Sequence, residues 1–214
     1  MERTNNKIEF YSRIFFAVIF AVGVLGHSFL FTKNYMLMLT PFVLLISYGI
    51  LFYFVLKTRD NNFLIWIAAT FVFTLVCEII GVNTGLIFGD YIYGKTLGIK
   101  FLGVPPIIGI NWIFVIIGAY QISGRIAQKR IFRILISALL SIAFDFILEP
   151  VAIRLDYWTW SAGEIPSYNY FSWFLISMIS LLVLSILKAQ IQTKIFEYFL
   201  VVQVMFFLLL NFVA

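Results

Sequence analysis

The sequence predicts an all-α protein, a polytopic membrane bundle of about seven transmembrane helices. The chain of 214 residues is 63% hydrophobic and only 12% charged, whereas a soluble domain averages about 25% charged residues. Its mean hydropathy is +1.02. Seven apolar segments each reach the length of about 20 residues that a helix needs to cross a bilayer. We therefore expect residues 1–214 to form a single transmembrane domain.

The predicted spans follow one another along the chain with mostly short spacers. In order, they are 11–31, 36–56, 63–82, 104–123, 131–150, 170–188 and 194–213. Pro105 and Pro106 fit the start of the fourth span, because proline is favoured in the first turn of a helix. Two spacers are long, 83–103 and 151–169.

The basic residues orient the predicted bundle. Most of the 15 lysines and arginines lie before the first span or in the spacers after the second, fourth and sixth spans. Because such loops stay in the cytoplasm, we predict a cytoplasmic N-terminus and an outer C-terminus, in the bacterial cytoplasmic (inner) membrane. The net charge of +5 is scattered between apolar spans, so no nucleic-acid partner is expected.

Three carboxylates lie within the most apolar stretches: Glu78, Asp145 and Glu149. Each costs about 2.5–3.5 kcal/mol at membrane depth on insertion scales, which favours a functional role. Asp145 and Glu149 are four residues apart and share one helix face. In a low dielectric one of them should keep a proton, as a general acid requires. Asp145 is the better candidate, since Glu149 lies at the end of its span, where we expect water to reach it.

The predicted orientation places His27 and the three acids late in spans that run outward. All four are therefore expected in the same outer half of the membrane. His27 follows Gly23 and Gly26, and small residues at this spacing also suit close helix packing. The sequence leaves two interpretations open: a histidine in a helix interface, or one that tunes the proton of a nearby acid.

The two long spacers supply further candidate residues. The first is rich in glycine but still apolar, so we expect it to fold back over the bundle as a lid. Its polar residues are Asn83, Asp90, Tyr91 and Tyr93, and Asn111 and Trp112 follow in the fourth span. Around the second spacer lie Trp158, Trp160, Asn169 and Trp173. An aromatic belt at the membrane interface explains most of these rings; ring faces that stabilise a carbocation are the alternative.

The residue inventory favours acid chemistry without a cofactor. Cys77 is the only cysteine and His27 the only histidine, which excludes an internal disulfide, a cysteine-based metal site and a multi-histidine iron site. We therefore expect no metal. The candidate residues suit an uncharged, lipid-soluble alkene: an acid protonates the double bond, rings shield the tertiary cation, and a second carboxylate helps water to add.

Four segments, in this order and spacing, carry a resemblance to a known family. They are EIIGVNTGLIFGDYIYG (78–94), GVPPIIGINW (103–112), FDFILEPVAIRLDYWTW (144–160) and IPSYNYFSW (165–173). They resemble segments of the membrane carotenoid biosynthesis proteins, which include the carotenoid 1,2-hydratases and the bisanhydrobacterioruberin hydratases.

The resemblance implies an enzyme that adds water across the terminal 1,2 double bond of an acyclic carotenoid ψ-end, such as that of lycopene or γ-carotene, without a cofactor. It implies that Glu78, Asp145 and Glu149 are the acids of the site. The implied partners are the carotenoid, water, membrane lipids and other enzymes of the carotenoid pathway.

Two other functions stay open. A carotenoid (lycopene) cyclase begins with the same protonation, and a neighbouring double bond then captures the cation in place of water. Asn83, Asp90, Asn111 and Asn169 favour water at the outer mouth. A non-enzymatic transporter would usually show an internal repeat or polar residues at the midplane, whereas the polar set here lies off-centre.

Overall fold

The computed structural model describes the backbone of residues 2–213 and the side chains of residues 7–213. It contains seven long helices: α1 (Glu2–Ser28), α2 (Leu30–Lys57), α3 (Asn61–Thr84), α4 (Pro106–Ser123), α5 (Arg130–Arg154), α6 (Ser167–Leu187) and α7 (Ile195–Val213). All seven are long and apolar enough to cross a membrane. The predicted helical multi-pass bundle is therefore confirmed, and Pro106 begins α4 as expected.

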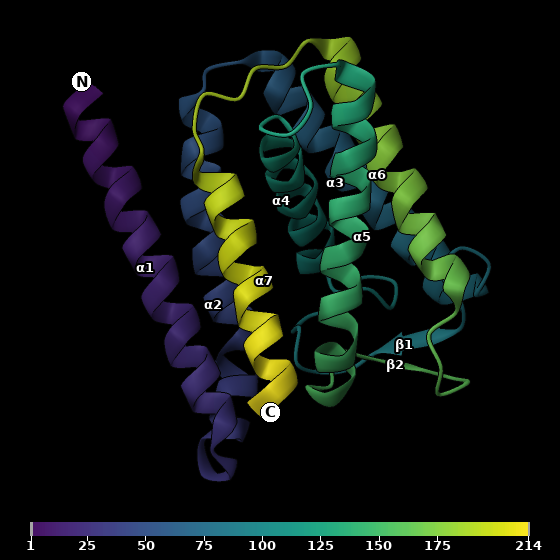
Figure 1. Cartoon of the computed structure of the whole chain (residues 1–214). Helices are drawn as coiled ribbons and strands as arrows, with labels where there is room; N and C mark the ends of the chain where they lie inside the picture. Colours follow the sequence, from purple (N-terminus) through teal and green to yellow (C-terminus); the bar gives the residue numbers. More distant parts are fainter. Residues whose placement is uncertain (1, 214) are drawn as a thin grey trace.

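The helix α4 lies at the centre of the bundle (Figure 1). Of its 18 residues, 72% are buried, and it packs mainly against α3, α5 and α7. A helix that is apolar on every side belongs in the interior. The peripheral helix α1 packs mainly against α2 and α7. The helix α4 is thus the buried centre of the bundle, and the helices around it can direct polar side chains inward.

Three helix ends differ from the predicted spans by four residues or more. The helix α1 begins at Glu2 rather than at residue 11. Only Phe29 separates α1 from α2, so the predicted spacer at 32–35 is helical. The helix α5 continues through Pro150 to Arg154, because packing inside a bundle compensates for the missing backbone N–H of a proline. The added turn buries Val151 and Ala152 and brings the next segment back beneath the helix.

The two long spacers meet in a small antiparallel sheet that hydropathy did not predict. The strand β1 (Tyr91–Tyr93) pairs with β2 (Trp158–Trp160), with Tyr91 opposite Trp160 and Tyr93 opposite Trp158. Since side chains alternate along a strand, these four rings are buried while Ile92 and Thr159 are exposed. We call this pair of strands the ribbon. In Figure 1 it lies at the lower right of the bundle, beside the lower end of α5 and below α6, so the first long spacer folds back over the bundle as expected.

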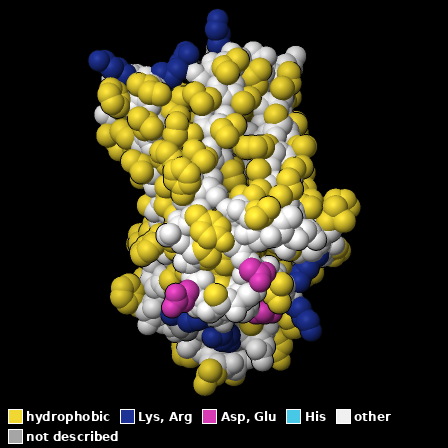
Figure 2. All heavy atoms as spheres, turned by 90° about the vertical axis from the view of Figure 1, so that its right-hand side faces the viewer, with side chains coloured by type: hydrophobic (Ala, Val, Ile, Leu, Met, Phe, Trp, Pro, Cys, Tyr) yellow, Lys and Arg dark blue, Asp and Glu magenta, His cyan; other side chains and the backbone are white. Residues whose placement is uncertain are grey.

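The surface of the bundle is divided along its length. On the face in Figure 2, hydrophobic side chains cover the middle, lysine and arginine gather at one end, and acidic and basic side chains lie together near the other. The two chain termini lie at opposite ends of the bundle (Figure 1). Opposite ends agree with an odd number of crossings, while the side of the membrane on which each terminus lies stays a prediction.

Candidate active site

The three membrane carboxylates line one small cavity beneath the ribbon. Glu78 comes from the end of α3, and Asp145 and Glu149 come from the end of α5; each is only 2–3% exposed. The sequence predicted that the three carboxylates lie at the same depth in the membrane, and the structure adds that they face the same cavity. The cavity is lined by Glu78, Phe88, Tyr91, Tyr93, Ile108, Asn111, Trp112, Asp145, Leu148, Glu149, Trp158, Trp160, Asn169 and Trp173.

Glu149 is surrounded by hydrogen-bond donors. Its Oε2 accepts from the indole Nε1 of Trp158 at 2.9 Å and of Trp160 at 3.1 Å. Its Oε1 lies 3.4 Å from the amide Nδ2 of Asn169. An indole nitrogen can only donate, and donors of this kind stabilise the ionised carboxylate. Glu149 is buried rather than open to bulk water as expected, because the ribbon covers this end of α5.

Glu78 anchors the other strand of the ribbon. Its Oε2 accepts from the phenol of Tyr91 and, at 2.7 Å, from that of Tyr93. Burial, reinforced by the neighbouring Glu78, raises the pKa of both tyrosines well above the ordinary value. Both phenols therefore keep their protons and act as donors. These contacts hold the first long spacer against α3, so Glu78 has a structural role whatever its chemistry.

Asp145 has fewer donors than the other two acids in the described part of the chain. Its Oδ2 accepts from Nδ2 of Asn169 at 3.1 Å, and the same nitrogen lies near Glu149. One amide is thus shared between two carboxyl groups on adjacent turns of α5. Two buried carboxylates at this spacing do not ionise together easily. The hydrogen-bond pattern favours a proton on Asp145 and a charge on Glu149.

Stacked aromatic rings also line the cavity. The rings of Trp112 and Trp173 stack with centroids 3.5 Å apart, and Phe88 stacks on Trp173 at 5.0 Å. Ring faces of this kind attract a cation. The interpretation of Trp158, Trp160 and Trp173 as an interfacial belt was wrong, because all three are at most 7% exposed.

Three predicted residues lie away from the acids. His27 lines a neighbouring cavity. Asn83 is exposed and donates to the carbonyls of Ile79 and Leu102, and Asp90 is also exposed. Both residues lie in or next to the turn that connects α3 to the ribbon.

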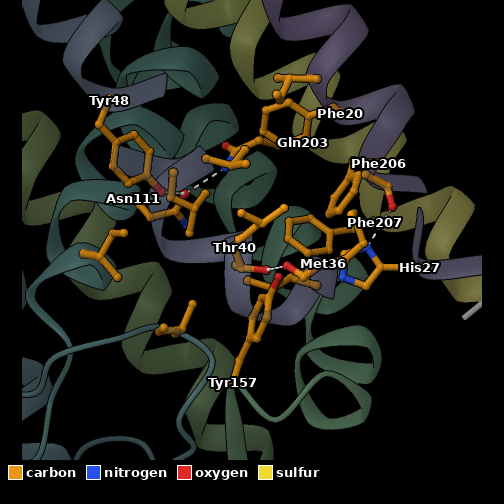
Figure 3. Close-up of a pocket in the computed structure, with 18 of the residues that line it drawn as sticks. Phe20, His27, Met36, Thr40, Tyr48, Asn111, Tyr157, Gln203, Phe206 and Phe207 are labelled. Atoms are coloured by element: carbon orange, nitrogen blue, oxygen red, sulfur yellow. Dashed lines mark hydrogen bonds between the residues drawn. The ribbon is translucent and has the colours of Figure 1, made fainter. Parts of the chain in front are cut away.

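The neighbouring cavity is larger than the one that the acids line, and it was not predicted from the sequence. It is partly open to the outside, and the space between its lining atoms is about 900 Å³ when open solvent at its mouth is included. In its wall, Oδ1 of Asn111 accepts from Tyr48 and from Gln203, each at 2.9 Å (Figure 3). Gln203 interrupts the apolar run of the seventh predicted span, a signal that the sequence did offer.

The two cavities adjoin each other. Ile108, Asn111, Leu148 and Trp158 line both of them. Phe88, Ile108 and Leu148 were not predicted as site residues, because an apolar side chain in an apolar span carries no pattern that sets it apart.

These features define a multi-pass membrane protein with a buried, acid-lined and aromatic cavity. A family model described as "Carotenoid biosynthesis protein" matches residues 34–214, and the chain therefore belongs to that family. It is similar to the bisanhydrobacterioruberin hydratase of Haloarcula japonica, with 27% identity over 113 residues. That match covers 49% of this chain but only 39% of the relative. No solved structure matches the chain.

Proposed function

We propose that this protein is a cofactor-independent carotenoid 1,2-hydratase. In this proposal it adds water across the terminal double bond of an acyclic ψ-end, such as that of lycopene or γ-carotene. The observation that carries it is the burial of three carboxyl groups in one aromatic cavity beside a large apolar one. Membership of the carotenoid biosynthesis family and the hydratase named among its relatives support the same conclusion.

The first step is protonation of the alkene by Asp145. Its proton passes to the less substituted carbon of the terminal double bond, which leaves a tertiary cation on the other carbon. The charges of Glu78 and Glu149 and the aromatic lining of the cavity stabilise that cation in a space from which bulk water is excluded. A buried acid is a weak donor, so this stabilisation is what makes the transfer favourable.

The second step is capture of the cation by water. Glu149 accepts a proton from the attacking water as the new carbon–oxygen bond forms. That proton then returns to Asp145, one helical turn away and linked to Glu149 through Asn169. One water is consumed, nothing is oxidised or reduced, and both acids end in their starting states.

The test is expression of the chain in lycopene-producing bacteria, with mass analysis of the extracted pigments. We expect a product heavier than lycopene by one water, and incorporation of heavy oxygen from labelled water. Asp145→Asn keeps the shape of the side chain and removes the acid, so we expect the yield to fall by about 10²–10⁴-fold.

Other outcomes would contradict the proposal. An isomer of unchanged mass would support the cyclase, because a double bond would then have captured the cation. Unchanged lycopene from well-expressed protein, with γ-carotene also unchanged, would exclude hydration of these ψ-ends. Normal hydration by membrane-inserted Asp145→Asn would remove Asp145 from the mechanism.

A further inference from the structure

The larger cavity carries polar groups that the proposed reaction does not use. It lies between α1, α2, α4, α5 and α7, and its wall is mostly apolar. Among the described residues, two buried atoms in this wall have no hydrogen-bond partner: Nε2 of His27 and Oε1 of Gln203. The side chains are only 5% and 2% exposed, and both flank the cavity (Figure 3). Leaving such atoms unpaired is costly, so each of them needs a hydrogen-bond donor, from a ligand or from water.

Both unpaired atoms are hydrogen-bond acceptors that lack a donor. Nδ1 of His27 lies 2.7 Å from the carbonyl oxygen of Gly23, so Nδ1 carries the proton and Nε2 of the neutral ring is an acceptor. The amide nitrogen of Gln203 donates to Asn111, which leaves its oxygen as an acceptor. A cavity that is otherwise apolar and offers acceptors is complementary to an apolar ligand with a hydrogen-bond donor.

His27 lines only the larger cavity, and the three acids line only the smaller one. His27 is on α1, which packs mainly against α2 and α7, whereas the acids come from α3 and α5. Asn111 and Trp158 lie between, since they line both cavities. A ligand that fills both cavities would therefore place its end at the acids and another part of its chain at His27.

The cavity also has a route of entry from the bilayer. Val22 on α1 and Leu39 on α2 line it, and they are 51% and 47% exposed on the outside of the bundle. Because these two helices are peripheral spans, that outer surface faces lipid. These residues mark the side of the cavity from which an apolar chain dissolved in the membrane would enter.

We propose that the larger cavity binds the body of a long isoprenoid chain that carries a hydroxyl group, and that His27 accepts the hydrogen bond of that hydroxyl. This rests on the proposed function for the identity of the reacting end and deepens it: a ψ-end chain that carries a hydroxyl gains this hydrogen bond, whereas a hydrocarbon such as lycopene binds without it. Nε2 of His27 then sets a preference for chains with a hydroxyl at one distance from the terminal double bond.

The test measures binding without turnover. The full-length chain carrying Asp145→Asn, in lipid nanodiscs, is titrated calorimetrically with geraniol, farnesol and geranylgeraniol, and with the hydrocarbon that matches each alcohol in length. All three alcohols end in the same type of double bond and hold the hydroxyl at increasing distance from it. We expect one alcohol to bind on the order of tenfold more tightly than its hydrocarbon, as one added hydrogen bond allows.

Substitutions at position 27 test whether His27 causes the preference for the alcohol over its hydrocarbon. His27→Phe removes the acceptor and keeps a ring, so the ratio of affinities should fall to about one. His27→Gln supplies an acceptor again and should restore part of the preference. Ser28→Ala is the matched control: the neighbouring Ser28 is exposed and only donates to the carbonyl of Val24, so this variant should keep the wild-type ratio.

Each result bears on one proposal separately. Equal affinity for every alcohol and its hydrocarbon, or a preference that survives His27→Phe, would overturn the role of His27 and leave its acceptor to water alone. The pigment assay is scored on the wild-type chain. A preference that depends on His27, together with no water addition in that assay, would overturn the hydratase and leave the hydroxyl site standing.

Discussion

At the scale of single residues, the neighbours of the acids distinguish their roles. Glu78 accepts hydrogen bonds from two phenols, and Glu149 accepts them from two indoles. Among the described residues, Asp145 accepts one only from the amide of Asn169, which it shares with Glu149. The sequence identified the acids because a charge in an apolar span stands out. It did not predict these partners, since Trp158 is nine residues beyond Glu149 and follows a turn whose direction no local pattern fixes.

We predict that Trp158→Phe slows hydration by about tenfold to a hundredfold, because a hydrogen bond to a charged group contributes about 1.5–3 kcal/mol. The measurement is the initial rate of water addition in membranes with equal amounts of protein. Trp66→Phe is the matched control, since buried Trp66 donates to the carbonyl of Ser180 at 2.6 Å, away from the acids. It should melt earlier yet hydrate at the wild-type rate; a wild-type rate for Trp158→Phe would contradict the role of its N–H.

At the scale of the helices, close packing of α4 on α7 depends on Gly118. A Cβ atom at this position would lie 2.7 Å from the carbonyl oxygen of Phe196 and 2.8 Å from Cβ of Leu200. Backbone atoms cannot move aside as a flexible side chain can, so the helices would have to separate. Small residues allow membrane helices to approach in this way. The helix positions were predictable from hydropathy, but not which glycine lies in an interface.

We predict that Gly118→Ala destabilises the bundle by about 1–3 kcal/mol, the usual cost of overpacking. Thermal unfolding in detergent, followed by circular dichroism, measures the loss. Gly49→Ala, also within a helix, is the control, because a Cβ there would meet nothing within 4 Å, and its melting temperature should stay at or above that of the wild type. Equal melting temperatures for the two variants would contradict the proposed contact.

At the scale of the whole molecule, the ribbon closes the end of the bundle that holds the acids. The two spacers that form it are far apart in sequence, and each contributes two buried rings. The positive-inside prediction places this end at the outer surface of the membrane. Water for the proposed reaction would then come from the outer side, while the carotenoid enters from the lipid.

We predict this orientation for the protein in cells, and single cysteines can test it. In a Cys77→Ala background, Glu164→Cys reports the loop between β2 and α6, and Gln128→Cys reports the connection between α4 and α5; both positions are exposed. A membrane-impermeant thiol reagent should label only position 164 in intact cells and both positions after lysis. Labelling of position 128 alone in intact cells would reverse the orientation.

The sequence by itself determined the seven spans, the acids worth testing and the lid, because hydropathy and the cost of a buried charge depend only on the residues of a short segment. It also carried the motifs of the carotenoid biosynthesis family. Only the tertiary structure decided that Glu78 meets Asp145 and Glu149, that the tryptophans of the second spacer face inward, and that a cavity with His27 in its wall adjoins the acids. The physical reason is that depth in a membrane follows from hydropathy, whereas lateral neighbours follow from side-chain packing between helices distant in sequence.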